Sequence, residues 1–266
     1  MINKLFNAFT KMGLGLALVG TASFGMVQTA DAQNVLKIGT EGAFPPFNFV
    51  DKDGNVGGFD VDIAKALCAE MKRECEFVVQ DWDGMIPALQ SKKFDALVAS
   101  MSITEDRMRV IDFTRPYYAD QSRFVAKMGA FADDKPATLG GKRIGVQRAT
   151  INQDYLEKYY SDVTIMPYGS QEEANLDLVA GRVDAVMAEQ ITLDEGFLKT
   201  DAGKGYGFFG GYHFDKSTHG EGIGIGVRKQ DSALKAALND AIMAIKANGT
   251  YDQINDKYFD YSIWVD

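Results

Sequence analysis

Histidine and cysteine are scarce in this chain of 266 residues, which contains two of each. His213 and His219 stand six positions apart, and no Cys/His cluster accompanies them that would indicate a metal site. The sequence also contains neither a nucleophile elbow nor a Ser/His/Asp order, and "GEGIGIG" lacks the G-x-G-x-x-G spacing of a dinucleotide site. We therefore expect no metal, no cofactor and no catalytic residues.

Basic residues are too few to form a surface for a polyanion. Lys and Arg number 28 against 37 Asp and Glu, which gives a formal net charge of −9. Nucleic acids and anionic membranes attract basic patches, so this balance argues against both as partners. It suits a small cationic ligand.

The N-terminal apolar run is interpreted as a signal peptide. A start with two lysines precedes an apolar span over 12–27, and "ADA" at 30–32 matches an A-x-A cleavage signal. The glycines of the span and the cleavage signal favour this interpretation over the alternative, a membrane anchor. Export to the periplasm with cleavage after Ala32 would leave 26 basic and 36 acidic residues, a net charge of −10.

Both cysteines, Cys68 and Cys75, lie in the part expected to be exported. In an oxidising compartment such a pair is expected to form a local disulfide, since redox catalysis prefers C-x-x-C, which is absent. On the chain-entropy description, so short a loop contributes only about 2.5 kcal/mol of stability.

Strand-like apolar runs and helix-like amphipathic segments alternate through the chain, and this rhythm is typical of parallel α/β sheets. Up to residue 100 the pattern predicts strands at 35–40, 75–80 and 94–100 and helices at 59–72 and 83–93. After residue 120 it predicts strands at 141–147, 162–168 and 183–189 and helices at 151–160 and 170–182. Two series of about a hundred residues each indicate two lobes rather than one sheet.

The last third follows another pattern, with a glycine-studded strand at 220–229 and helices at 232–249 and 251–259. These elements can pack back on the first lobe, so the chain would cross between lobes near 118–123 and again near 217–222. Two crossing segments form a hinge, and a hinge between lobes forms a cleft. The predicted units are a signal peptide at 1–32, a first lobe at 33–120 with 222–266, and a second lobe at 121–221.

The stretch "VASMSITEDRMRV" at 98–110 places a cation where a helix begins. Thr104 is a suitable N-cap, and Arg107 then stands in the first turn, where it opposes the helix dipole unless an anion meets it. The alternative is a solvated arginine. Alternation in a strand places Ser100 and Ser102 on one side, beside the same helix start. Two hydroxyls, free N–H groups and a guanidinium would hold a carboxylate, with serine oxygens left for an ammonium, and this predicts an amino-acid clamp.

The mature chain resembles the periplasmic polar-amino-acid-binding proteins of ABC importers, solute-binding protein family 3, in the lysine, arginine, ornithine and histidine branch. The motifs that carry this resemblance, in order, are "GTEGAFPPF", "GFDVDIAKALC", "WDGMIPAL", "SMSITEDR", "IGVQRATIN", "YGSQEEANLDLVAGRVDAV" and "GTYDQINDKYFD". The resemblance implies an α/β, two-lobed periplasmic-binding-protein fold of type II, in which each lobe is a mixed sheet flanked by helices and two hinge strands join the lobes. It also implies a monomeric receptor that traps a basic L-amino acid by lobe closure and delivers it to a membrane ABC permease.

The resemblance assigns one set of residues to the ligand α-carboxylate. Arg107 would bind it through its side chain, with help from Ser102. The backbone N–H groups of Thr150 and Ile151 would complete this side. Ile151 replaces a threonine common in the family, so only its backbone can serve there.

The α-ammonium would be bound by oxygens. Ser100 would offer its carbonyl and Ser102 its hydroxyl, and Glu189 falls where the family usually has an aspartate paired with this group. The longer side chain of Glu189 keeps the charge and shifts the geometry. A surface acid is the alternative interpretation of Glu189.

The residues expected around the ligand side chain are Glu41, Phe44, Trp82 and Ala99. A carboxylate between two aromatic faces attracts a guanidinium or ammonium, which favours arginine, ornithine or lysine over neutral amino acids. Phe44 replaces a tyrosine of the family and keeps only the stacking surface, and a plain core residue is its alternative interpretation. Ala99, where relatives can carry serine, removes one hydrogen bond.

Three other functions compete with this interpretation. Exported dehydratases of cyclic amino-acid precursors share the scaffold, so fold alone does not exclude catalysis. An opine receptor is a second alternative, although the extra carboxylate of an opine would be repelled by Glu189. A sensor module is the third, and no transmembrane or signalling segment is expected after "WVD".

Overall fold

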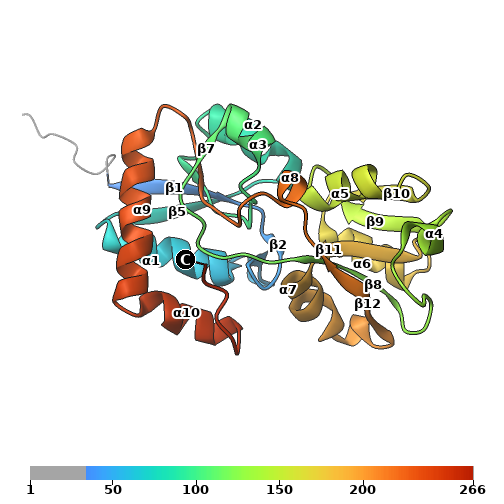
Figure 1. Cartoon of the computed structure of the whole chain (residues 1–266). Helices are drawn as coiled ribbons and strands as arrows, with labels where there is room; N and C mark the ends of the chain where they lie inside the picture. Colours follow the sequence, from blue (N-terminus) through green and yellow to red (C-terminus); the bar gives the residue numbers. More distant parts are fainter. Residues whose placement is uncertain (1–33, 266) are drawn as a thin grey trace, which may run out of the picture. The chain divides into compact units, whose positions relative to one another are not determined.

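The structure is a computed structural model that describes residues 34–265. The predicted signal peptide, residues 1–32, and its cleavage after Ala32 lie outside the described residues. The described part contains two five-stranded sheets, which belong to one compact unit (Figure 1).

The first sheet is mixed. Its strands run in the order β5 (Glu74–Val79), β1 (Val35–Thr40), β6 (Ala96–Leu97), β13 (Gly226–Val227) and β7 (Asp112–Phe113). Strand β1 is parallel to β5 and β6, whereas β13 is antiparallel to β6 and β7. Its helices are α1 (Phe59–Glu70), α2 (Met85–Gln90), which follows the 3₁₀ turn η2 (Trp82–Gly84), α3 (Glu105–Val110), α9 (Ser232–Ala247) and α10 (Thr250–Tyr258).

Helices cover both faces of this first sheet. Ile63 and Leu67, one turn apart on α1, are buried in the same cluster as Ile38 of β1, and α9 and α10 pack against α1 (Figure 1). On the other face, Met85 and Leu89 of α2 belong to a second buried cluster. The predicted disulfide between Cys68 and Cys75 is confirmed, and it ties α1 to β5.

The second sheet is also mixed. Its strands run in the order β10 (Thr164–Tyr168), β9 (Arg143–Gln147), β11 (Ala185–Glu189), β8 (Ser122–Lys127) and β12 (Tyr206–His213). Strand β9 is parallel to β10 and β11, and β8 is antiparallel to β11 and β12. The helical segments are α4 (Pro136–Leu139), α5 (Ile151–Tyr159), α6 (Gln171–Val179), α7 (Gln190–Leu193), a π-helical turn η3 (Asp194–Leu198), η4 (Asp201–Gly203) and α8 (Lys216–His219).

Alternating burial along the strands of the second sheet builds two apolar layers. Met187 of β11 joins Leu156 of α5 on one face, whereas Val186 joins Leu178 of α6 on the other. Each of the two large sheets therefore has helices packed on both sides, as expected for an α/β protein.

Two chain segments connect the sheets and pair with each other. Tyr118, between β7 and β8, forms an antiparallel bridge with Ile223, between α8 and β13. Gly220 has a φ of 74°, and a Cβ there would lie 1.9 Å from the carbonyl oxygen of Ile103, so this return segment requires glycine. The lobe boundaries given above stay a prediction.

Several local predictions differ from the structure. The strand expected at 94–100 is only two residues long, and the strand at 220–229 shrinks to β13 with a bridge at Ile223. Strands β8 and β12, the π-helical turn and the small sheet of β2 (Ala43–Phe44), β3 (Asn48–Val50) and β4 (Val56–Gly57) were not anticipated. Strand β12 is glycine-rich and β2, β3 and β4 are short, so they carry little periodicity and form by pairing with neighbours. Strand β8 begins in the segment that was expected to cross between lobes.

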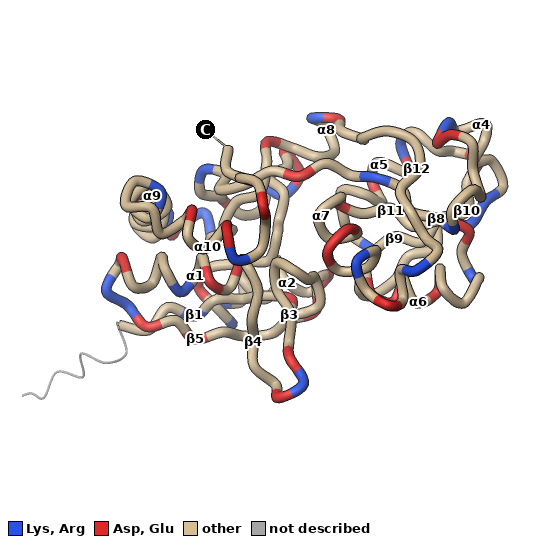
Figure 2. Tube along the Cα trace, turned by 90° about the horizontal axis from the view of Figure 1, so that it is seen from below, with Lys and Arg blue, Asp and Glu red and all other residues tan. Residues whose placement is uncertain are grey.

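Charged residues are distributed over the elements that surround both large sheets. Figure 2 shows Lys and Arg interspersed with Asp and Glu along the chain. The acidic excess is therefore spread out rather than gathered at one element.

Candidate ligand-binding site

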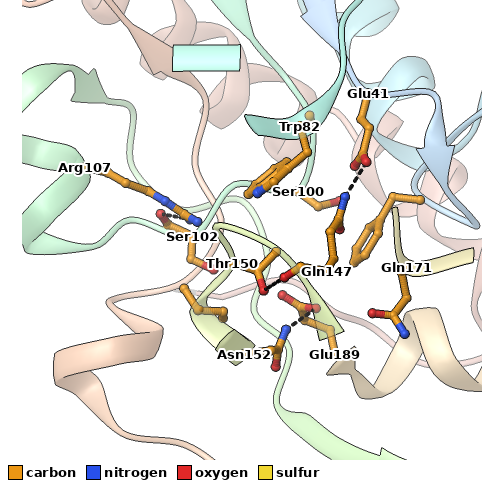
Figure 3. Close-up of a pocket in the computed structure, with 13 residues that line it drawn as sticks. Glu41, Trp82, Ser100, Ser102, Arg107, Gln147, Thr150, Asn152, Gln171 and Glu189 are labelled. Atoms are coloured by element: carbon orange, nitrogen blue, oxygen red, sulfur yellow. Dashed lines mark hydrogen bonds between the residues drawn. The ribbon is translucent and has the colours of Figure 1, made fainter. Parts of the chain in front are cut away.

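A cavity lies between the two sheets. All ten residues predicted as ligand contacts line it, together with three that were not predicted (Figure 3). The lining residues are Glu41, Phe44, Trp82, Ala99, Ser100, Ser102, Arg107, Gln147, Thr150, Ile151, Asn152, Gln171 and Glu189.

The fold brings these residues together because they follow strand ends. Glu41 comes directly after β1, Gln147 ends β9 and Glu189 ends β11. Parallel strands present their carboxyl ends at one edge of a sheet, and ligands of open α/β sheets bind outside that edge. The helices that start there, α5 and α6, direct their first N–H groups toward the same region.

Arg107 is held at the first turn of α3. The predicted cap is confirmed, since the Thr104 hydroxyl accepts a hydrogen bond from the Arg107 backbone N–H. The guanidinium donates to the Ser102 carbonyl at 3.0 Å, and its Cζ lies 5.3 Å from the Trp82 ring centre. Burial lowers the pKa of Arg107 to about 10, so the side chain stays charged at neutral pH. The cation thus lines the cavity, and the alternative of a freely solvated arginine is not what the structure shows.

Ser100 differs from the expectation drawn from strand alternation. The strand has already ended at Leu97, and the φ of Ser100 is 54°, in the left-handed region. The Ser100 hydroxyl donates to Asp60 at 2.9 Å, which turns it away from a carboxylate-binding role. Ser100 therefore does not share one strand face with Ser102.

Asp60 is also not the helix cap that its position indicates. The cap of α1 is Gly58, and no side chain bonds there. Asp60 is fully buried and accepts hydrogen bonds from Ser100, from Asn48 and from Tyr117, the last at 2.6 Å. Burial raises its pKa to about 6, and these donors lower it. Asp60 supports the Ser100 turn from behind the cavity.

The loop before α5 reaches across to the first sheet. Ala149 has a φ of 57°, and its carbonyl accepts hydrogen bonds from Trp82 at 3.0 Å and from Arg107 at 3.5 Å. Thr150, the next residue, caps α5 by accepting from the Gln153 backbone N–H. This loop fixes the start of α5 beside Arg107.

Glu189 ends β11 and is almost fully buried. It accepts a hydrogen bond from the Asn152 side chain at 3.0 Å, and Figure 3 shows the two groups pointing toward each other. Burial raises the pKa of Glu189, while the hydrogen bond and the charge of Arg107 lower it. A buried carboxyl at the cavity wall is not the surface acid considered above.

Glu41 lies at another part of the cavity and is buried with no basic partner among its described contacts. It accepts a hydrogen bond from Gln147 of the second sheet at 2.5 Å (Figure 3). Burial raises its pKa to about 7, and the nearby carboxylate of Glu189 adds to the rise. A cation placed here would reverse that shift, because an opposite charge favours the ionised carboxyl.

Two aromatic rings form part of the wall. Phe44 is buried yet lines the cavity, and its ring stacks 6.3 Å from Phe47, so it serves both the core and the cavity. Trp82 offers its ring to Arg107.

Sequence reasoning missed three lining residues, all of them amides. Gln147 stands at the end of a predicted strand, and Asn152 and Gln171 stand in the first turns of α5 and α6. Polar residues at these strand ends and helix starts are the signal that would have found them.

Two findings concern residues 34–265 alone. None of their helices combines the length and apolar character that a membrane span requires. Within the same range, no three His, Cys, Asp or Glu side chains are placed so that they could share a metal ion.

Comparison with known proteins places the chain in a family. Residues 36–261 match the bacterial extracellular solute-binding proteins, family 3. The L-arginine-binding protein of Pseudomonas aeruginosa is 49% identical over 94% of this chain and 98% of its own length. The lysine/arginine/ornithine-binding periplasmic protein of Escherichia coli is 36% identical over 95% of this chain and 98% of its length.

Comparison with solved structures agrees with this family assignment. A solved periplasmic binding protein with high arginine specificity from Salmonella typhimurium superposes with a TM-score of 0.80 at 35% identity, covering 85% of this chain and 99% of that one. The predicted type II fold is thereby confirmed. The chain belongs to family 3 of the bacterial extracellular solute-binding proteins.

Proposed function

We propose that this protein is an extracytoplasmic receptor for a basic L-amino acid, with arginine as its preferred ligand, and that it serves an ABC importer. The observation that carries the proposal is a cavity with a cation, Arg107, and two buried carboxyls, Glu189 and Glu41, at separate places in its wall. An α-amino acid with a cationic side chain has the complementary set of one anion and two cations. The ligands named for the relatives above support the same choice.

Arg107 and Glu189 are the proposed partners of the ligand's backbone groups. The guanidinium would pair with the α-carboxylate, aided by Ser102 and by the N–H groups of Thr150 and Ile151 at the start of α5. Glu189 would pair with the α-ammonium, aided by the Ser100 carbonyl. The fixed contacts of Arg107 and Glu189 favour this assignment, because both groups are already oriented by neighbours.

Glu41 is the proposed partner of the ligand side chain. Its carboxyl is desolvated and its pKa is raised to about 7, and a cation there would lower that pKa and favour the ionised carboxyl. Phe44, Trp82 and Ala99 would enclose the aliphatic part. A guanidinium could contact both Glu41 and the Gln147 amide oxygen, which a single ammonium does less well. This comparison favours arginine over lysine and ornithine.

We propose that the two sheets are the cores of two lobes, at 33–120 with 222–266 and at 121–221. Binding would begin on the first lobe, and closure would bring Glu189 and the start of α5 onto the ligand. The ligand stabilises the closed form only through contacts that exist in that form. Cleavage after Ala32, release into the periplasm, a monomeric state and delivery to a membrane permease complete the proposal.

The alternatives have less support. Of the described residues lining the cavity, Arg107 is the single Lys or Arg, so the second carboxylate of an opine would meet Glu41 or Glu189 without a cation. We propose binding without chemistry, and mass spectrometry of the bound ligand after long incubation tests this: arginine is expected back unchanged. A new product would establish an enzyme instead.

The decisive experiment is a titration of refolded mature protein with the twenty amino acids, ornithine, citrulline and octopine. Trp82 in the cavity wall should report binding through its fluorescence, and calorimetry would check each response. Saturable binding of arginine, with weaker binding of ornithine and lysine, is the expected result. Binding of octopine alone, or of none of these compounds, would contradict the proposal.

A further inference from the structure

His219 is a buried histidine that the proposed function does not use. It ends α8, on the segment that returns from the second sheet to the first, and it is 3% exposed. Its Nε2 lies 3.0 Å from the Ser122 hydroxyl at the start of β8. Both residues therefore sit where the two connecting segments meet the second sheet.

Ser122 continues this contact toward the cavity. Its hydroxyl lies 2.5 Å from the Asn152 amide oxygen, and the amide nitrogen of Asn152 donates to Glu189 at 3.0 Å. The sheet register explains the placement, because Ser122 of β8 is directly opposite Glu189 of β11 and opposed side chains share one face. Asn152, on the helix covering that face, contacts both.

The donors and acceptors in this chain have one consistent direction. The backbone N–H of Asp215 donates to Nδ1 of His219 at 3.2 Å, and the Thr218 hydroxyl lies 2.9 Å from the same nitrogen. An Nδ1 that accepts from the backbone leaves the ring hydrogen of a neutral imidazole on Nε2. Nε2–H then donates to the Ser122 oxygen, the Ser122 hydroxyl donates to Asn152, and the Asn152 amide donates to the Glu189 carboxylate. An ionised Glu189 carboxylate requires the same orientation, because it can only accept hydrogen bonds.

We propose that His219, Ser122 and Asn152 form a directional hydrogen-bond relay that positions Glu189 for the ligand α-ammonium and ties that carboxylate to the connecting segments. This inference rests on the proposed function and deepens it, because the relay acts on the α-ammonium pocket alone. His219 is a positioning residue and does not touch the ligand. Burial lowers the pKa of His219 to about 4, in keeping with the neutral ring that the relay requires.

The plain alternative is a histidine that only fills the core, and the test must separate the two. His219→Phe keeps the ring volume and removes the Nε2 donor, whereas His219→Gln keeps a donor near that place. His213 is the matched control, since it is also buried, contacts Tyr155 and Asp134, and pairs with Ser122 in strand register without joining the relay.

Calorimetry of the full mature protein should compare L-arginine with 5-guanidinopentanoate, which lacks the α-ammonium. For His219→Phe we expect arginine binding to weaken about 3- to 10-fold, the effect of one lost hydrogen bond, with 5-guanidinopentanoate unchanged. His219→Gln should stay close to wild type, and His213→Phe should leave the ratio of the two ligands unaltered. In a Glu189→Gln background, His219→Phe should add nothing further.

The outcomes are separable. If wild type binds no basic amino acid, the proposed function is wrong, and the proposed relay is wrong too because it rests on that function. If wild type binds arginine but His219→Phe weakens both ligands equally, or neither, the relay alone is wrong. Should His219→Phe not fold, Ser122→Ala breaks the middle link and carries the same expectation.

Nitrogen NMR provides a check that needs no ligand. The chain has two histidines, so their ring signals can be assigned with the His213→Phe variant. At pH 7 His219 should show the neutral Nε2–H form. A proton on Nδ1, or a charged ring, would overturn the relay.

Discussion

The two ends of the cavity are built differently. At the end assigned to the amino-acid backbone, Arg107 donates to the Ser102 carbonyl and to the Ala149 carbonyl, and Glu189 accepts a hydrogen bond from Asn152 of the neighbouring helix α5. At the side-chain end, Glu41 of the first sheet is held by Gln147 of the second, and its pKa is raised to about 7. The α-carboxylate and α-ammonium, which all α-amino acids share, are thus assigned to the rigid end, where the groups are already oriented. The cationic side chain, which distinguishes a basic amino acid, is assigned to a desolvated carboxyl that has no cation beside it.

Breaking the rigid end should have the largest effect. Arg107→Ala removes the proposed partner of the α-carboxylate, and we expect the affinity for arginine to fall by about 100-fold or more, as for loss of a buried charge-assisted contact. The melting temperature should change little, because burial already disfavours this cation and its loss costs the fold little. Calorimetry and a thermal melt measure both quantities.

Arg109→Ala is the matched control for that variant. Arg109 lies on the same helix, is exposed and pairs with Asp106. The Arg109→Ala variant should bind arginine with the affinity of the wild type. Normal binding by Arg107→Ala would show that the clamp is wrong.

Changing the side-chain end should alter the selectivity between arginine and citrulline more than the affinity for α-amino acids as a class. Glu41→Gln removes a charge but keeps a polar group beside Gln147, and we expect about 10- to 100-fold weaker arginine binding. Citrulline, a neutral isostere of arginine, should bind as before or better. Glu76→Gln, at an exposed position of β5, controls for the loss of one negative charge. Equal losses for the two ligands would mean that Glu41 does not meet the side chain.

The pH dependence sharpens the same contrast. In the unliganded protein burial raises the pKa of Glu41 to about 7, and a bound guanidinium would lower it, so binding favours the deprotonated carboxyl. Affinity for arginine should be full at about pH 8 and fall as the pH drops through 7, by about 30-fold between pH 8 and 5.5 if the bound carboxyl returns to its ordinary pKa. The ratio of arginine to citrulline binding isolates Glu41, because Glu189 acts on both ligands. A flat ratio would contradict the assignment.

The rigid end is also the part that the sequence predicts best. Capping by Thr104 and the strand end that carries Glu189 follow from local pattern, and the family motifs add Thr150 and Ile151. The Ser100 turn could not be predicted, since its left-handed backbone depends on Asp60, forty residues away in the chain. Gln147 ends a predicted strand, a position that could have indicated it, but its contact with Glu41 could not be predicted, because it joins two sheets whose relative placement no local pattern encodes.

The smallest expected effect belongs to an ion pair at neither end. Arg148 Nε lies 2.6 Å from Asp83, joining the loop before α5 to η2, and the two side chains are 47% and 42% exposed. Such exposed pairs contribute about 0.2–1 kcal/mol, so Asp83→Asn should weaken arginine and citrulline alike by about twofold, and the effect should vanish in about 1 M salt. Equal losses would mark a contact that stabilises closure alone. Asp83 also raises the pKa of Glu41 through its charge, so an effect on arginine that differs from citrulline would place the pair in the electrostatics of the side-chain end instead.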